Sequence, residues 1–147
     1  MEGIVGATFP VPRPLLARIL DEGKNVFVKP ATLTRIKPGM KIIFYASHEE
    51  QGFHGEAEVE GIEIFSNPME ILEKYKDGLF LTEKEFKDYV ASQKRWGRER
   101  HKPWMVIVLK NIKKYDKIVK PKRFIAVSGR YIREEEYREV LKKTEVS

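Results

Sequence analysis

Apolar residues recur along the chain in short runs that prolines and glycines separate. The clearest run, KIIFYA at residues 41–46, follows the turn dipeptide Pro38-Gly39. A near-continuous apolar run of this length predicts a strand that is buried on both faces. Similar runs predict strands at residues 3–9, 25–29, 104–109 and 123–127.

Residues 56–65 (EAEVEGIEIF) follow a different pattern, because acidic and apolar residues alternate. Alternation with a period of two predicts a strand with one face in solvent. Glu56 and Glu58 are therefore expected on the solvent face, and residues 48–55 before them are expected to form a polar loop.

Helical spacing of apolar residues predicts four helices. The first begins at Pro14 and ends at Gly23, and the second begins after Asn67. Thr82 and Glu85 form a capping box for a third, which continues to about residue 96, and residues 133–143 form the last. Strands thus follow one another mostly through turns, which favours an α+β fold with a small mixed barrel and outer helices. We expect one domain over residues 1–147 with a two-helix insertion at about residues 67–102.

The charge of the chain indicates the kind of partner that it could bind. The net charge is +6 and the isoelectric point is near 9.4, which suggests a polyanionic partner. The distribution is uneven: residues 49–88 carry a net charge of −8, whereas residues 13–41, 94–102 and 110–123 carry +5, +4 and +6. Two readings stay open, namely a nucleic-acid partner and surface ion pairs between the blocks.

Several kinds of protein are excluded or disfavoured by composition. The absence of cysteine excludes disulfides and thiolate metal sites. His48 and His54 are six residues apart in a polar loop, a poor spacing for metal ligands, so no metal or cofactor is expected. No apolar run approaches the ~20 residues of a membrane span, and the N-terminus lacks the pattern of a secretion signal. We therefore expect a cytoplasmic protein without membrane association.

The sharpest candidate binding segment is KRWGRERHKPW at residues 94–104, where basic residues surround tryptophan. Basic side chains neutralise phosphates, and an indole ring offers a surface on which a base stacks. Trp96 is the candidate stacking residue, whereas Trp104 belongs to an apolar strand and is expected in the core. The candidate nucleic-acid contacts in this segment are Lys94, Arg95, Trp96, Arg98, Arg100 and Lys102. Arg130, after a glycine turn, is a further candidate for a phosphate contact.

The order of motifs resembles PUA-like domains, especially their ASCH and EVE branches. The residues concerned are LLARILDEGKNVFVK, LTRIKPGMKIIFYAS, HGEAEVEGIEIF and, later, WMVIVLKNIKKYDKIVKP. The resemblance implies a partly open β-barrel that binds RNA or a modified base, within a small archaeal family of unassigned function. It places four basic residues around the ligand groove, namely Lys24, Lys29, Arg35 and Lys37.

Some ASCH proteins are amidohydrolases that act on acetylated cytidine, and this resemblance sets an alternative. Their site has a lysine three residues before a threonine nucleophile, and a glutamate from a later strand. Lys24 matches the lysine, Phe27 stands at the threonine position, and Glu56 or Glu58 could supply the glutamate. Because phenylalanine is no nucleophile, we predict a non-catalytic module that binds RNA or a modified nucleotide. The alternatives are a small hydrolase of a modified nucleoside and a protein-interaction module that uses the acidic middle.

Overall fold

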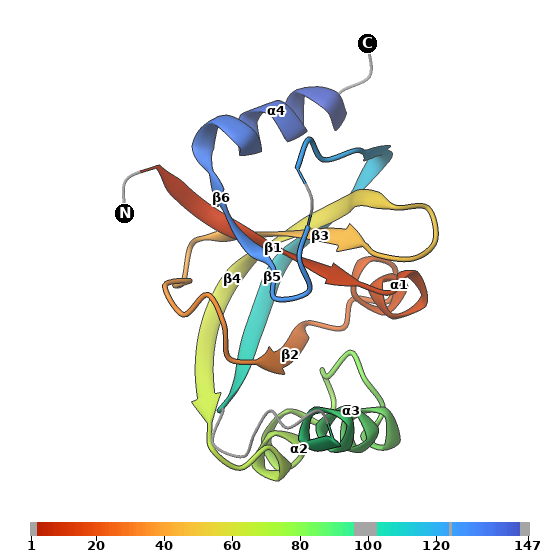
Figure 1. The fold of residues 1–147 in the computed structure, drawn as a ribbon, viewed down its shortest axis with the longest axis vertical. Coiled ribbons are helices and arrows are strands. Elements are labelled where there is room, and N and C mark those ends of the chain that lie inside the picture. Colours follow the sequence, from red (N-terminus) through yellow and green to blue (C-terminus); the bar gives the residue numbers. More distant parts are fainter. Residues whose placement is uncertain (1–2, 96–102, 124, 145–147) are drawn as a thin grey trace.

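The computed structural model describes residues 3–95, 103–123 and 125–144. These residues form six strands and four helices, and Figure 1 shows their arrangement. In chain order they are β1 (Ile4–Val11), α1 (Arg13–Leu20), β2 (Val26–Pro30), β3 (Lys41–Ala46), β4 (Gly52–Phe65), α2 (Met69–Tyr75), α3 (Glu83–Arg95), β5 (Trp104–Val119), β6 (Arg130–Arg133) and α4 (Glu134–Thr144).

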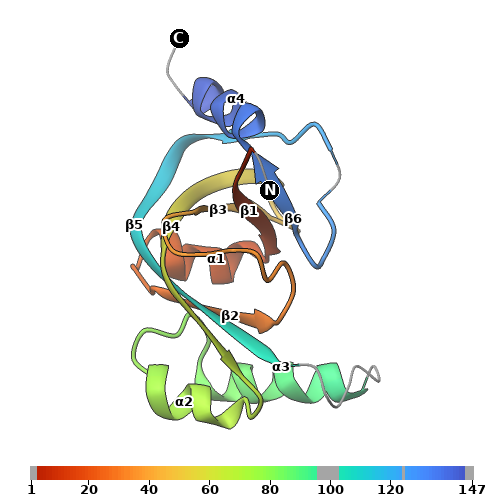
Figure 2. The same ribbon diagram turned by 90° about the vertical axis from the view of Figure 1, so that its left-hand side faces the viewer.

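The six strands form one mixed sheet in the order β2-β5-β4-β3-β1-β6. β1 pairs with β3 in parallel, and the other neighbours are antiparallel. The sheet coils strongly but does not close, because β2 and β6 remain at its two ends. Helices α2 and α3 lie at one end of the molecule and α4 at the other (Figures 1 and 2). The predicted α+β fold with a partly open mixed barrel is confirmed.

The sheet separates two apolar clusters, and β3 shows how the sequence builds both. Ile42 and Phe44 belong to a large cluster with residues of α1 and α3, whereas Ile43 belongs to a smaller cluster beneath α4. Successive residues of a strand point to opposite faces, so the run at residues 41–46 feeds both clusters at once. This is the two-sided burial that its composition predicted.

Two strands extend well beyond their predicted bounds, and one further strand prediction was wrong. β4 begins at Gly52, inside the expected polar loop, and β5 continues ten residues beyond Leu109. No strand forms in the described part of residues 123–127; the edge strand lies at Arg130–Arg133 and pairs with β1. Register shifts between β4 and β5, and the positive φ of Asn111, break the alternation that sequence reading relies on.

In the part of the chain that the structure describes, no helix has the length and apolar character needed to cross a membrane.

Candidate functional site

A groove of about 470 Å³ lies between β1, β2 and helix α3. Its wall is largely apolar, and three phenylalanine rings pack together there. The ring centroid of Phe27 is 5.7 Å from that of Phe9 and 5.1 Å from that of Phe80. All three rings are buried, whereas Tyr89 of α3 lines the groove and is half-buried. The groove therefore has an aromatic floor and one accessible aromatic side wall.

The sequence brings these rings together from distant segments. Phe27 lies on β2, and the segment after α2 runs beside the same strand. The Val26 amide donates to the Gly78 carbonyl (2.9 Å), and the Phe80 amide donates to the Val26 carbonyl (3.1 Å). Tyr89 is fixed by an edge contact with Trp104, at 5.1 Å between ring centroids, and burial raises the pKa of its hydroxyl to about 12. Its hydroxyl group therefore stays protonated at neutral pH.

Lys29 brings a positive charge into this wall. Its residue is only 6% exposed, and its ammonium lies 4.7 Å from the ring centroid of Phe9. The ammonium donates hydrogen bonds to the Pro30 carbonyl (2.9 Å) and to the Thr32 hydroxyl. The Thr32 hydroxyl in turn donates to the Ser128 carbonyl (3.1 Å). A charge held by this many contacts has a fixed position, and a low-dielectric surrounding strengthens its field.

A second hollow of about 390 Å³ adjoins the groove. Lys29, Tyr89 and Val127 line both spaces. The remaining lining of the second hollow is more polar and consists of Pro30, Thr32, Gln93 and Ser128. Val127 is 89% exposed, more than any other large apolar residue that the structure describes.

The structure spreads the other predicted groove residues around β2. Lys24 precedes β2 and donates from its ammonium to the Asp77 carbonyl (3.2 Å). Arg35 and Lys37 are exposed in the loop that follows β2, and the Arg35 amide donates to the Tyr131 hydroxyl (2.9 Å). Lys24 is thus separated from Arg35 and Lys37 by the length of the strand, and only Lys29 lines the groove.

The remaining predicted binding residues belong to the segment 94–104 and to the start of β6, and only some of them lie in the described part of the chain. Lys94 and Arg95 form the last residues of α3, while Trp96, Arg98, Arg100 and Lys102 lie outside the described residues. Trp104 is buried in the core, as expected. Both terminal nitrogens of Arg130 bind the carboxylate of Glu136, at 2.7 and 2.6 Å. This contact, together with the charge of Arg130, lowers the pKa of Glu136, so the arginine charge is neutralised within the fold.

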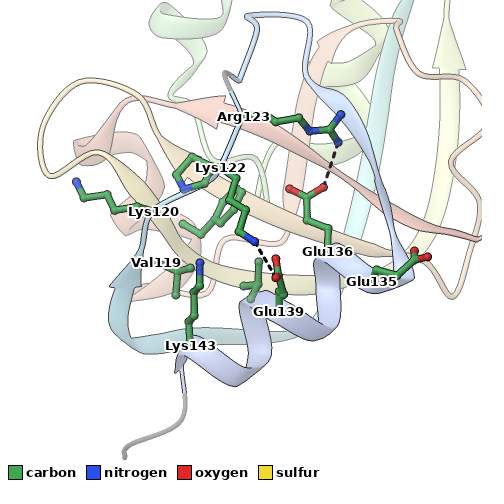
Figure 3. Close-up of a pocket in the computed structure, with 11 residues that line it drawn as sticks. Val119, Lys120, Lys122, Arg123, Glu135, Glu136, Glu139 and Lys143 are labelled. Atoms are coloured by element: carbon green, nitrogen blue, oxygen red, sulfur yellow. Dashed lines mark hydrogen bonds and ion pairs between the residues drawn. The ribbon is translucent and has the colours of Figure 1, made fainter.

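A further pocket of about 370 Å³ lies between the end of β5 and α4 (Figure 3). Basic side chains surround it, but acidic side chains of α4 pair with several of them. The Lys122 ammonium is 2.8 Å from the Glu139 carboxylate, and the Arg123 guanidinium is 3.5 Å from that of Glu136. Ion pairs between the charge blocks are therefore part of the fold, and Figure 3 shows two of them.

The basic run at residues 110–123 pairs in the same way with distant acids. The Lys110 ammonium is 3.6 Å from the Glu58 carboxylate, and that of Lys114 is 2.8 Å from Asp21. Exposed pairs of this kind contribute only about 0–1 kcal/mol each. They nevertheless reduce the field of this segment, which makes the groove the stronger candidate site.

Comparison of the sequence with known proteins identifies the family of this chain. The sequence model of a family described as a domain of unknown function, DUF365, matches residues 4–134. The chain belongs to the DUF365 family. An uncharacterized protein from Methanocaldococcus jannaschii is 65% identical over 107 residues, which cover 71% of this DUF365 chain and 99% of that protein.

Solved structures share the fold at low sequence identity. The ASCH protein from Zymomonas mobilis aligns with a TM-score of 0.71 at 17% identity, over 92% of this chain and 93% of that one. A mutant of the same protein reaches a TM-score of 0.79 at 16% identity, over 97% and 99% of the two chains. The N-terminal domain of McrB from Staphylothermus marinus aligns with a TM-score of 0.57 at 20% identity, over 97% and 98%. The predicted resemblance to ASCH domains is confirmed as a resemblance of fold.

Glu56 corrects the prediction made from alternation. Its residue is only 5% exposed, and its carboxylate accepts hydrogen bonds from the hydroxyls of Tyr115 (2.8 Å) and Tyr137 (2.7 Å). The Lys41 ammonium lies 3.7 Å away. Burial, and then the neighbouring carboxylate, raise the pKa of both tyrosines, so both hydroxyls remain donors. Helix α4 covers this face of the sheet, and sequence alternation gives no sign of such a cover.

The position of Glu56 bears on the hydrolase alternative. Its tyrosine partners belong to the small cluster beneath α4, whereas Phe27 belongs to the large cluster on the other face of the sheet. Phe27 and Glu56 therefore do not lie together, so this pair does not reproduce the threonine and glutamate positions that the ASCH resemblance implies.

Proposed function

We propose that this protein is an RNA-binding module that takes an unpaired or modified base into the groove beneath α3. The observation that carries the proposal is an aromatic groove with the ammonium of Lys29 fixed in its wall. Its volume of about 470 Å³ lies within the range of about 300–1,000 Å³ that small-ligand sites occupy.

Tyr89 is the residue against which a base would stack. Phe9, Phe27 and Phe80 are buried and form the floor, so their rings offer little open face. Tyr89 is half-buried and lines both the groove and the second hollow. Stacking of a base on an aromatic ring contributes about 1–3 kcal/mol to the binding free energy. It does not depend on which base is bound, because every base has a π face.

The backbone would be held by the basic segment that continues from α3. Tyr89 of this helix lines both hollows and Gln93 lines the second, and the helix ends with Lys94 and Arg95. The sequence then continues through Arg98, Arg100 and Lys102. Phosphate contacts position a strand without reading its sequence, so this segment would supply affinity while the groove selects the base.

Binding is favoured over hydrolysis by the groove itself. By the resemblance, Phe27 stands at the position at which the ASCH amidohydrolases have their nucleophile, and its ring forms part of the floor. Glu56 lies on the opposite face of the sheet and is held there by two tyrosines. The shared ASCH fold supports the proposal by analogy only.

The first experiment replaces Tyr89 with alanine and measures binding of a fluorescent, mixed-sequence single-stranded RNA by anisotropy. Loss of one stacking contact is expected to weaken binding by about 5- to 150-fold, corresponding to ~1–3 kcal/mol. Circular dichroism would show that the variant remains folded. Unchanged affinity in the folded variant would remove the groove from the proposal.

The second arm replaces Arg95, Arg98 and Arg100 together with alanine. Each phosphate contact on a single strand adds about 0.7 to the slope of log affinity against log salt, so the slope should fall by about 2. The matched control replaces three lysines of α2, α3 and the loop between them that line neither hollow, namely Lys74, Lys76 and Lys87, and should leave the slope unchanged. Equal slopes in the two triple variants would contradict a role for the arginine segment.

A further inference from the structure

The groove and the second hollow form a pair with one shared boundary. Both have a similar volume, about 470 and 390 Å³, and Lys29, Tyr89 and Val127 belong to the lining of each. The groove is mostly apolar, whereas Gln93 and Ser128 make the second hollow polar. Two adjacent spaces of similar size and different polarity fit a ligand made of two linked units.

The shared boundary is a fixed structure. The Lys29 ammonium donates to the Pro30 carbonyl and the Thr32 hydroxyl, and the Thr32 hydroxyl donates to the Ser128 carbonyl. These bonds join the segment after β2 to the turn before β6, so the boundary keeps its shape. A positive charge therefore lies where the linkage between two units would cross.

Polar groups in the second hollow remain available to a ligand. The amide of Gln93 and the hydroxyl of Ser128 have no hydrogen-bond partner among the residues that the structure describes. An amide offers two donors and an acceptor, and a hydroxyl offers a donor and an acceptor, which suits a sugar hydroxyl or a base edge. Val127 adds an apolar contact at the boundary, since this residue is 89% exposed and would be covered by a ligand.

We propose that the two hollows bind two consecutive nucleotides of one RNA strand. The base of one nucleotide occupies the aromatic groove, the other nucleotide lies against Gln93 and Ser128, and the phosphate between them crosses beside Lys29. This inference rests on the proposed function, and it sets the smallest ligand as a dinucleotide.

The test compares the four nucleoside monophosphates with the four corresponding homodinucleotides, by titration of the isotope-labelled protein in NMR. The wild-type protein should bind its preferred dinucleotide at least about tenfold more tightly than the monophosphate, since one further polar or stacking contact contributes about that factor. The side-chain amide signals of Gln93 should shift with the dinucleotide and stay in place with the monophosphate.

The double variant Gln93→Ala with Ser128→Ala should lose the dinucleotide advantage and keep the monophosphate affinity. Gln51→Ala is the matched control, because Gln51 is the other glutamine of the chain and binds the Ser47 carbonyl away from both hollows. Equal wild-type affinity for the two ligands, or an advantage that survives in the double variant, overturns the two-nucleotide site and leaves the base groove standing. Absence of binding to every nucleotide and to the longer RNA overturns the proposed function itself.

Discussion

The buried carboxylate of Glu56 allows a stability prediction with a defined magnitude. Replacing Tyr137 with phenylalanine removes the 2.7 Å hydrogen bond to one carboxylate oxygen and keeps the ring. The other oxygen keeps its bond to Tyr115, and the Lys41 ammonium remains 3.7 Å from the carboxylate. Hydrogen bonds to charged groups contribute about 1.5–3 kcal/mol, so the partly buried position of Tyr137 leads us to expect a loss of about 2 kcal/mol.

Guanidinium chloride unfolding, followed by circular dichroism, measures this loss. With a slope of about 4 kcal/mol per molar, the midpoint should fall by about 0.5 M without a change of slope. Tyr45→Phe is the matched control. Tyr45 contacts the same cluster, and its hydroxyl has no hydrogen-bond partner within the described part of the chain. Its loss should stay within about 0.5 kcal/mol. If Tyr137→Phe is no more destabilising than the control, the carboxylate is not held by this hydroxyl and the account of α4 docking fails.

Two further predictions concern the frame around the groove. Arg18, first by its hydrogen bonds, holds the pKa of Glu85 at about 2 against an ordinary value of 4.5, so this stabilisation is present above pH 4.5 and is lost as the pH falls toward 2. In Arg18→Met the difference in thermal unfolding temperature between pH 7 and pH 3 should shrink, and an unchanged difference would contradict this account. Gly6→Ala would place a Cβ atom 1.8 Å from the Lys41 carbonyl oxygen in the β1–β3 pair and should cost more than about 3 kcal/mol, beyond the usual range for an added core methyl. Gly61→Ala in β4 meets no atom within 4 Å and should be tolerated; equal loss in both variants by denaturant titration would refute the argument.

Elements set by local physics could be predicted from the sequence. The capping box is one example: the Thr82 amide donates to the Glu85 carboxylate (2.8 Å), and the Glu85 amide donates to the Thr82 hydroxyl (3.1 Å). β3 is another, because its boundaries follow from the turn before it and from its own apolar residues. Both depend on neighbours within a few residues, which is the range that sequence patterns describe.

Features that depend on distant segments could not be predicted in this way. The burial of Glu56 requires α4, some eighty residues later, to cover the sheet. The second half of β5 is rich in exposed lysines, so its sequence lacks the apolar pattern of a strand. Lys29 was expected in a basic patch at a groove rim with Lys24, yet β2 directs it into the wall between two hollows. Sequence reading thus found a residue of the candidate site, while its role depends on which chain segments meet there.

The segment that links α2 to α3 has a consequence for the solubility of any shortened form of this chain. Residues 78–80 bind the outer edge of β2 through two backbone hydrogen bonds and a parallel bridge between Val26 and Leu79. An edge strand with unpaired backbone groups is a template for association with other chains. The helical segment between β4 and β5 therefore also covers part of the edge of β2. Its removal would expose unpaired backbone groups in a strand that begins with valine and phenylalanine, and this edge would promote aggregation.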